Sequence, residues 1–391
     1  MGKFFLNKFL KNLFSETCEV QYWDGTIEKF GEGKSKFKIL INKHISEKEI
    51  IKDPFLTLGE AYMDNIIDFQ GSIQEIIESI YKNKESFLHK ASIFSKLYNV
   101  TKHSIKQNKK DIQYHYDLGN NFYSLWLDKT LSYSCAYFKD NGDSLYDAQR
   151  HKVSYILKKL NLNKGDTLLD IGCGWGELII DAAKEYDVKA IGITLSEEQV
   201  EKVNERIKEN NLENLVEVKL MDYRELIKEH KKFNRIVSVG MIEHVGRKNI
   251  PEFIKDVSEL LEDEGVSLLH CITAQIEGEA NEWIKQYIFP GGYIPSIREL
   301  VYNMAEANLH LVDVESLRLH YSKTLECWAK NFENNLEKVK KIKDERFIRM
   351  WRLYLNSCAA SFHYGVIDIH QFLVTKGLNN KLPMTREYLY K

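Results

Sequence analysis

From about residue 113 onward, short apolar runs alternate with longer stretches in which apolar residues recur every three or four positions. The short runs are typical of buried strands, and the longer stretches are typical of helices with one apolar face. This alternation predicts an α/β fold with a parallel, doubly wound sheet. The predicted strands are 167–171, 188–194, 216–221, 234–240, 266–273 and 309–317, and the predicted helices include 177–186, 197–211 and 251–265.

The amino-terminal part of the chain has a different pattern, in which short strand-like runs are mixed with helical patterns. This mixture is typical of a small α+β domain. A basic, polar stretch separates the two patterns and favours a linker or a loose helix. The predicted organisation is an α+β domain at 1–95, a basic linker at 96–112 and an α/β domain at 113–391.

Composition narrows the class of protein. The chain has 391 residues, of which 43% are hydrophobic and 29% charged, as in a soluble protein with a full core. Its net charge of -2 creates no global field that would indicate a nucleic-acid partner. The 6 cysteines are far apart and form no C-x-x-C pair, so they predict neither a zinc site nor a disulfide framework. We therefore expect a cytoplasmic protein without a metal site.

The first helical pattern of the chain leaves two interpretations open. Residues 1–110 contain 18 Lys and only 14 Asp or Glu, and residues 1–14 place lysines between apolar residues at helical spacing. Such a helix could lie on an anionic membrane surface. It could equally face the core of the amino-terminal domain. No stretch of the chain has the length and apolar character of a transmembrane span.

The segment 168–176, LLDIGCGWG, carries the clearest chemical signal. Its apolar run ends at Asp170, and glycines then follow at alternate positions before a helical pattern. Glycines are needed where the backbone turns sharply and a ligand lies directly against it. The spacing is neither that of a dinucleotide site nor that of a phosphate loop, and the carboxylate before the turn suits a cationic ligand. These features resemble the first motif of S-adenosylmethionine-dependent methyltransferases.

The ends of the next two predicted strands supply the rest of a cofactor pocket. Thr194 and Gln199 offer hydroxyl and amide groups to a ribose, and Ser196 is expected to cap the following helix. Asp222 could accept from an adenine amino group, and Tyr223 could stack on the ring. The candidate cofactor residues in these three regions are Asp170, Gly172, Gly174, Gly176, Thr194, Leu195, Gln199, Asp222, Tyr223 and Arg224.

Further motifs narrow the family. They are YHYDLGNNFYSLWLD (114–128), LSYSCAYF (131–138), VGMIEHVG (239–246), LLHCIT (268–273), YIFPGGYIPS (287–296), HYSKTLECWAKNF (320–332) and SCAASFHYGVIDIHQFLVTK (357–376). Together and in this order they closely resemble the bacterial cyclopropane-fatty-acyl-phospholipid synthase family. The resemblance covers most of 113–391 and reaches GEAYMDNIIDF (59–69) in the amino-terminal domain.

The resemblance implies a Rossmann-like class I methyltransferase sheet with helical insertions. It also implies that a methylene group passes from S-adenosylmethionine to the cis double bond of an unsaturated acyl chain in a membrane phospholipid. The first product would be a carbocation, from which a base removes a proton so that a cyclopropane ring closes. A protein of this kind would attach peripherally to the inner face of the cell membrane. The amino-terminal domain is expected to contact the membrane, a second subunit in a homodimer, or both.

The family motifs also imply roles for individual residues. Tyr133 and Ser134 would contact the cofactor. A bound bicarbonate would be the base, and its holders would be Cys135, Glu243, His270, Ile272 and Tyr321. The Cys135 and Ile272 contacts would come from the backbone, because neither side chain is a good donor. Since two anions repel in a dry pocket, we expect Glu243 to accept the bicarbonate proton.

The resemblance of the last motif to the family implies that Cys358 is an active-site cysteine. The reaction needs no thiolate nucleophile, and no basic residue stands next to Cys358 in sequence to lower its pKa. We therefore expect Cys358 to be a small residue packed in a helix.

Two alternatives differ from the ring-forming enzyme. The first is a related methyltransferase of unsaturated lipids that does not close the ring. The second is a lipid-binding or scaffolding protein without activity on a methyltransferase fold. The complete glycine motif and the presence of Glu243, His270 and Tyr321 favour the ring-forming enzyme over both.

Overall fold

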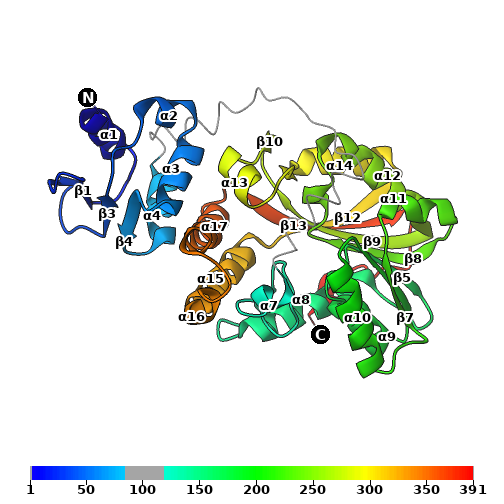
Figure 1. Ribbon diagram of the computed structural model, residues 1–391. Helices are drawn as coiled ribbons and strands as arrows, with labels where there is room; N and C mark the ends of the chain where they lie inside the picture. Colours follow the sequence, from blue (N-terminus) through cyan, green and yellow to red (C-terminus); the bar gives the residue numbers. More distant parts are fainter. Residues whose placement is uncertain (1, 84–118, 391) are drawn as a thin grey trace. The chain divides into compact units, whose positions relative to one another are not determined.

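The computed structural model describes residues 2–83 and 119–390 (Figure 1). Its elements form two compact units, which we call the amino-terminal unit and the sheet unit. The amino-terminal unit contains the described residues up to 83 together with 278–290 and 325–366. The sheet unit contains the rest. Two later segments therefore group with the amino-terminal residues instead of with the remainder of 113–391.

The basic linker predicted at 96–112 lies outside the described residues. So do the first residues of the motif at 114–128.

The sheet unit is built on a seven-stranded sheet with the strand order β12-β13-β9-β8-β5-β6-β7 (Figure 1). All six strands predicted from the sequence are present. The strands are β5 (Thr167–Ile171), β6 (Lys189–Thr194), β7 (Val216–Leu220), β8 (Phe233–Val239), β9 (Leu261–Thr273), β12 (Leu309–Ser316) and β13 (Asp368–Lys376).

One strand departs from the predicted all-parallel sheet. Strands β6, β7, β8 and β9 run parallel to their partners on either side of β5. Strand β13 enters between β9 and β12 and is antiparallel to both. The sequence pattern did not reveal β13, which is buried along nearly its whole length. The α/β class is confirmed, and the all-parallel arrangement is wrong at this edge of the sheet.

The order of the strands places a topological switch point at the centre of the sheet. Strand β5 pairs with β6 on one side and with β8 on the other, so the chain changes direction across the sheet between these neighbours. In open α/β sheets, ligands bind beyond the carboxyl ends of the strands at such a switch point. The glycine motif follows β5 directly, and therefore lies at this position.

Helices cover both faces of the sheet (Figure 1). One apolar cluster joins the strands to α8 (Leu145–Leu160), α9 (Glu177–Tyr186) and α10 (Glu197–Glu209). The other joins them to α12 (Ile250–Leu260) and α14 (Ile297–Glu306). The helix predicted at 251–265 is too long at its end, because Leu261 already pairs with Phe233 as the first residue of β9.

The amino-terminal unit has a four-stranded sheet in the order β2-β1-β3-β4. This architecture confirms the predicted mixture of strands and helices. Its strands are β1 (Cys18–Gln21), β2 (Ile27–Phe30), β3 (Phe37–Ile41) and β4 (Ile67–Gln70). Its helices are α1 (Gly2–Lys11), α2 (Glu47–Lys52), α3 (Pro54–Met63), α4 (Ile73–Lys82), α13 (Glu282–Tyr287), α16 (Leu336–Val339) and α17 (Glu345–His363).

Helix α1 is held by the core of this unit. Leu6 and Leu10 are buried in the apolar cluster, together with Leu13 just beyond the helix. Of the two interpretations of this segment, the core-facing helix is therefore confirmed. Phe4 is nevertheless 78% exposed on the opposite face of α1.

Polar contacts attach the two later segments to the amino-terminal unit. Trp283 of α13 is buried and donates its indole N–H to the Met63 sulfur at 3.2 Å. Ser361 of α17 lies 2.9 Å from the Tyr81 hydroxyl. Trp283, which precedes the motif at 287–296, is therefore used for packing within this unit.

The remaining described helices are short, apart from α15. They are α7 (Asn120–Tyr123), α11 (Tyr223–Leu226), α15 (Arg318–Asn334), η1 (Ile227–Glu229), η2 (Ile242–His244), η3 (Arg247–Asn249) and η4 (Arg386–Leu389), and two short strands are β10 (Gly278–Glu279) and β11 (Tyr293–Ile294).

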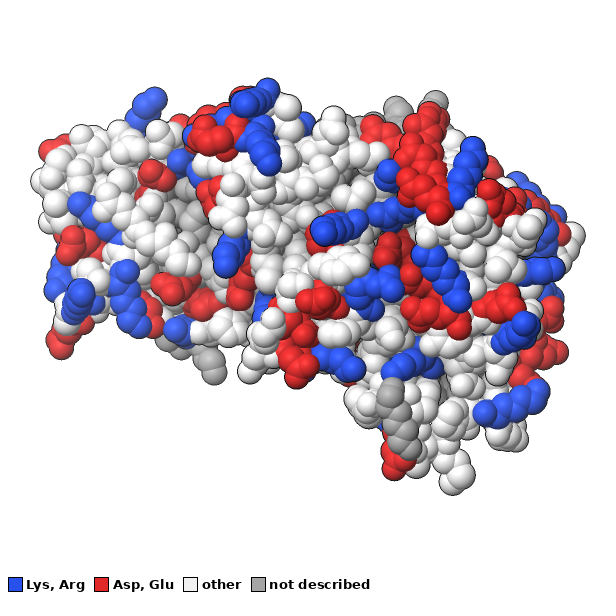
Figure 2. Space-filling view, turned by 90° about the horizontal axis from the view of Figure 1, so that it is seen from below, with Lys and Arg blue, Asp and Glu red and all other residues white. Residues whose placement is uncertain are grey.

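The surface adds little to the choice of partner. Basic and acidic side chains are interspersed over the face seen in Figure 2, in keeping with the net charge of -2. Among the described residues, no helix combines the length and the apolar character needed to cross a membrane.

Candidate functional site

The glycine motif forms the tight turn that the sequence predicts. Gly172, Gly174 and Gly176 all have positive φ angles, of +86°, +53° and +81°. A Cβ atom on Gly174 would meet nothing within 4 Å, so this backbone borders open space. A Cβ on Gly176 would instead lie 2.8 Å from Val203 of α10. The open space beside Gly174 suits close approach of a ligand. Glycine is needed at position 176 because a side chain there would clash with α10.

Asp170 supplies a buried carboxylate at the start of the same turn. Its side chain is 3% exposed, and its Oδ1 atom has no hydrogen-bond partner among the described residues. Burial raises the pKa of this carboxyl to about 7, although the charge of Lys152 opposes the rise. An unpartnered acceptor in this position suits a ligand that brings a cationic donor.

The end of β6 presents a hydroxyl and an amide, as predicted. The Thr194 hydroxyl donates to the Gln199 side-chain oxygen at 2.6 Å. The amide NH2 of Gln199 is therefore the group that it can offer to ribose oxygens. Leu195 is half-buried between them. The Ser196 hydroxyl accepts from the Gln199 backbone N–H at 3.3 Å, which confirms the predicted helix cap.

The polar and aromatic side chains at the end of β7 have partners within the protein. Both Asp222 oxygens accept from the Arg224 guanidinium, at 2.8 and 2.7 Å. The Tyr223 ring is buried and packs edge-on against Phe253 at 5.1 Å. Tyr223 is therefore a core residue, and its position gives no support to the predicted stacking on adenine.

The motif at 131–138 is held over this region by two side chains of α8. The Gln149 amide donates to the carbonyls of Ser132 and Ser134, at 3.3 and 2.9 Å. The Lys152 ammonium donates to the Ser134 hydroxyl at 3.0 Å. Tyr133, between these two serines, is half-buried and its ring contacts the Trp126 ring at 5.3 Å.

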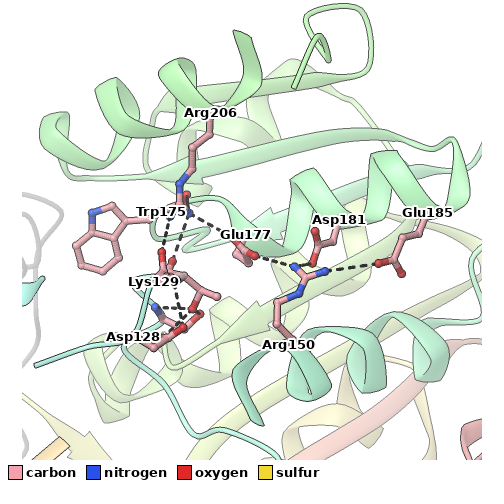
Figure 3. Close-up of polar contacts among 10 residues, drawn as sticks. Asp128, Lys129, Arg150, Trp175, Glu177, Asp181, Glu185 and Arg206 are labelled. Carbon is pink, nitrogen blue, oxygen red and sulfur yellow. Dashed lines mark hydrogen bonds and ion pairs between the residues drawn. The ribbon is translucent and has the colours of Figure 1, made fainter. Parts of the chain in front are cut away.

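Arg206 connects the two residues just before this motif to the glycine turn (Figure 3). Its guanidinium donates to the Trp175 carbonyl at 2.9 Å, and to the carbonyls of Lys129 and Thr130 at 3.3 Å each. It also pairs with Glu177, whose other oxygen accepts from Arg150 at 2.7 Å. One side chain of α10 thus ties together two segments that carry candidate cofactor residues.

A second candidate site begins at the end of β8. The carbonyl of His270 in β9 accepts from Gly240 N–H at 2.8 Å and anchors the loop that carries Glu243. The Glu243 Oε1 atom accepts from the Ile272 N–H at 2.6 Å. The Ile272 N–H therefore serves Glu243, and the predicted backbone contact of Ile272 with a bound anion stays a prediction.

The pKa of the Glu243 carboxyl lies close to neutral pH. Its Oε2 atom is buried without a hydrogen-bond partner among the described residues. Burial raises the pKa of this carboxyl to about 7, and the Ile272 N–H opposes the rise. At neutral pH the group can therefore either hold a proton or accept one.

His270 is fixed in one tautomer by a residue that sequence reasoning missed. Its side chain is 1% exposed, and burial lowers its pKa to about 3, so the ring is neutral. The Gln371 amide nitrogen lies 3.2 Å from His270 Nδ1 and can only donate, because an amide NH2 has no lone pair to offer. The proton of the neutral ring is therefore on Nε2, which is buried without a partner among the described residues.

Hydrogen bonds through Leu317 connect Cys135 and Tyr321 to β13, which pairs with β9. The Leu317 N–H donates at 2.9 Å to Ile369, which pairs with Ile272 across the sheet. The Leu317 carbonyl accepts from Tyr321 N–H at 3.0 Å and from the Cys135 thiol at 3.8 Å. Cys135 and the buried Tyr321 are thus both anchored to Leu317, and their predicted contacts with a bound anion stay predictions. Burial raises the pKa of the Cys135 thiol, which remains protonated.

The glycine turn and the Glu243 loop are in contact. A Cβ atom on Gly172 would lie 3.3 Å from the Met241 side chain, two residues before Glu243. The cofactor candidates and the base candidates therefore belong to adjacent parts of one region of the sheet unit.

Cys358 belongs to α17 and hence to the amino-terminal unit. Burial raises the pKa of its thiol to about 12, so the side chain is a thiol and not a thiolate at neutral pH. This position favours the predicted packing role.

The polar residues that the sequence analysis missed have a common signature. Gln149 and Lys152 lie on the buried stripe of the helix α8, and Gln371 interrupts the buried run of β13. A polar side chain on an otherwise apolar face is the signal that could have revealed them. Within residues 2–83 and 119–390, no group of three or more His, Cys, Asp or Glu side chains is arranged to hold a metal ion.

Comparison with known protein families matches residues 103–372 to the family described as "Mycolic acid cyclopropane synthetase". Residues 5–92 match a domain of unknown function, DUF7884. The chain is 38% identical to the "Probable fatty acid methyltransferase" of Pseudomonas putida, over 95% of this chain and 96% of the relative. It is 35% identical to the "Cyclopropane-fatty-acyl-phospholipid synthase" of Escherichia coli K12, over 87% of this chain and 88% of the relative.

A solved structure with the same architecture is that of mycolic acid cyclopropane synthase CmaA1 complexed with SAH and CTAB. It is 34% identical in sequence and has a TM-score of 0.65. The similarity covers 68% of this chain and 98% of that chain.

Proposed function

Because the chain belongs to the mycolic acid cyclopropane synthetase family, we propose that it transfers a methylene group from S-adenosylmethionine to a cis double bond in the acyl chain of a membrane phospholipid. Its family makes it an S-adenosylmethionine-dependent methyltransferase of unsaturated lipids. The finer proposal concerns the phospholipid substrate and the closing of the ring. The ring closure rests chiefly on the buried Glu243 and His270 atoms that have no partner among the described residues, and the phospholipid substrate rests on the similarity to the Escherichia coli synthase.

The glycine turn is the proposed cofactor site. Gly174 borders open space that the adenosine part can approach, and the Gln199 amide faces ribose oxygens. The unpartnered Asp170 oxygen suits the cationic amino group of the methionine part. Asp222 retains a proposed role with adenine through lone pairs that Arg224 leaves unused.

The reaction itself needs an oriented alkene and a base. The alkene carbon attacks the sulfonium methyl, the carbon–sulfur bond breaks toward sulfur, and a carbocation forms on the acyl chain. Loss of a proton from the added methyl supplies the electron pair that closes the ring. Water would capture the cation, so the base must lie in a site from which water is excluded.

We propose that bicarbonate is this base, because the buried polar atoms fit such an anion. His270 Nε2–H is an unpartnered donor and Glu243 Oε2 is an unpartnered acceptor, as a hydrogen-bearing anion requires. Bicarbonate would supply a small base that takes a proton beside a positive charge. Gln371 keeps the His270 proton on Nε2, and Glu243 accepts the proton of the anion. Tyr321 and the Cys135 backbone complete the proposed set.

A second candidate is methyl transfer to an unsaturated fatty acid or lipid without ring closure. The name of the Pseudomonas putida relative, a probable fatty acid methyltransferase, favours it. The two reactions share the methyl transfer and differ in which proton leaves the cation.

An isotope experiment separates the two candidates. Purified protein is incubated with S-adenosylmethionine that carries a CD3 group and with either phospholipid vesicles or free fatty acid, each containing a cis double bond. Ring closure removes one deuterium from the transferred group and leaves no double bond, whereas methylation with loss of a proton from the acyl chain retains all three deuteriums and a double bond. Retention of the full label, or transfer to the free acid alone, would contradict the proposed function. Omission of bicarbonate from degassed buffer should slow turnover without weakening cofactor binding.

We propose that the amino-terminal unit brings the enzyme to the inner face of the cell membrane, in the cytoplasm. Phe4 on α1, together with Ile27 and Ile51, exposes apolar side chains there. The lysines of α1 add attraction to anionic lipid. Flotation with anionic vesicles should decrease for Phe4→Ser and Lys8→Ser but remain unchanged for Tyr302→Ser, which lies on α14. Cross-linking in solution tests the proposed homodimer.

A further inference from the structure

Among the described residues, Lys152 is a buried cation without a carboxylate partner. Its side chain is 5% exposed, and its hydrogen bond goes to the Ser134 hydroxyl at 3.0 Å. Among the described residues, no carboxylate lies within ion-pair distance of its ammonium group. Burying a charge without pairing it is costly, so a position of this kind needs a reason.

A second buried lysine on the same helix has the partners that Lys152 lacks. Lys159 is 1% exposed, and its ammonium pairs with Glu315 and lies 3.9 Å from Asp313. Lys159 is therefore a satisfied structural ion pair. The contrast between the two lysines indicates that Lys152 is matched to a charge that the chain itself does not supply.

Carboxylates lie near Lys152 without forming an ion pair with it. Burial lowers the pKa of Lys152, and the nearby carboxylates of Asp128 and Asp170 favour its charged form. Asp170 has an unpartnered oxygen of its own beside the glycine turn. One buried cation and one buried acid, neither paired with the other, border the same region.

Lys152 also determines which way the Ser134 hydroxyl can act. An ammonium group only donates, so the Lys152–Ser134 bond occupies a lone pair of the Ser134 oxygen. The hydroxyl hydrogen remains available for donation to another acceptor. Gln149 fixes the backbone of this serine by donating to its carbonyl at 2.9 Å. Ser134 is thus held as a donor with a cation behind it, which is a suitable partner for a carboxylate.

We propose that Lys152 is a positioning residue that acts through Ser134 to recognise the carboxylate of the methionine part of S-adenosylmethionine. Asp170 would receive the ammonium group of the same amino-acid end, so that the two charges of the zwitterion meet opposite charges. The inference rests on the proposed cofactor site at the glycine turn. It assigns a role to a residue that neither the motifs nor the glycine spacing indicate.

The test compares two ligands that differ only in the carboxylate. Isothermal titration calorimetry measures the binding of S-adenosylmethionine and of decarboxylated S-adenosylmethionine to the full-length protein. The parent protein should prefer the intact cofactor by roughly 10- to 100-fold, as expected for a hydrogen bond to a charged group. Lys152→Met should reduce this preference to about threefold or less. Ser134→Ala should reduce it in the same direction.

Lys159→Met is the matched control. It removes a buried lysine from the same helix and leaves Glu315 without its cation, so it should lower the stability but keep the ligand preference. Equal loss of affinity for both ligands in Lys152→Met would assign Lys152 a structural role and overturn the inference. A parent protein that binds both ligands equally would overturn it without any variant. A parent protein that binds neither ligand would instead refute the proposed cofactor site.

Discussion

Replacing Glu243 should separate the stability of this protein from its activity. The Glu243 Oε2 atom is buried without a partner, and burial raises the pKa of the carboxyl from 4.5 to about 7. Glutamine has the same shape, can still accept from the Ile272 N–H and carries no charge. We predict that Glu243→Gln stabilises the folded protein above neutral pH and removes most of the activity, while cofactor affinity changes by only a few-fold.

The magnitude follows from the difference in pKa between the folded and unfolded states. Because the folded pKa is the higher one, the folded state binds the proton more tightly, and stability is lost as pH rises from 4.5 through 7. Below that window both states are protonated and the carboxyl costs nothing. Above it the charged carboxylate costs the folded state about 3 kcal/mol.

Urea unfolding of both proteins without ligands tests this prediction. The difference in unfolding free energy, variant minus parent, should be below about 1 kcal/mol near pH 5 and about 3 kcal/mol near pH 8. The difference isolates Glu243, since every other titrating group is common to both proteins. Glu306→Gln removes an exposed carboxylate from α14 and controls for the loss of one negative charge.

A stability difference that does not change with pH would refute the reasoning, because the buried charge is its only cause. Full activity of Glu243→Gln would contradict the proposed role of Glu243 as a proton acceptor.

Three further predictions concern other parts of the site. Gly174→Val should abolish cofactor binding in calorimetry, because its side chain would occupy the open space beside a backbone with φ of +53°; retained affinity would place the cofactor elsewhere. Gln371→Met should remove the donor to His270 Nδ1, so that nitrogen NMR of the ring detects exchange between the two neutral tautomers. Turnover should fall about 10-fold or more, and an unchanged tautomer would contradict the assignment. Cys358→Ser should keep substantial activity, since burial keeps this thiol protonated, and near-complete loss in a folded variant would show that the cysteine takes part.

Local features of the chain were predictable to the extent that they depend on neighbouring residues. Ser196 caps its helix because its hydroxyl and the Gln199 N–H lie within one turn. The glycine turn forms where the sequence places it, because only glycine adopts these positive φ angles without strain. The apolar spacing at residues 6, 10 and 13 predicted a buried stripe but did not distinguish a protein core from a membrane.

Other features depended on residues far apart in the chain. Strand β13 mixes apolar and polar residues, and only the packing of the sheet buries it and places it antiparallel between β9 and β12. Tyr223 stands at the end of a strand, where a cofactor contact is expected, yet its ring meets Phe253 in the core. No local pattern distinguishes these outcomes, since the same apolar and aromatic residues serve both.

By itself, the sequence determined the α/β class, the turn that can receive the cofactor, and the residue types available for proton transfer. Only the tertiary structure decided their chemical states. Gln371 assigns the proton of His270 from 101 positions away, and the closure of the core around Glu243 brings its pKa near neutrality. The reason is physical: hydrogen-bond direction and desolvation act through space, and the order of residues along the chain does not specify which groups will be enclosed together.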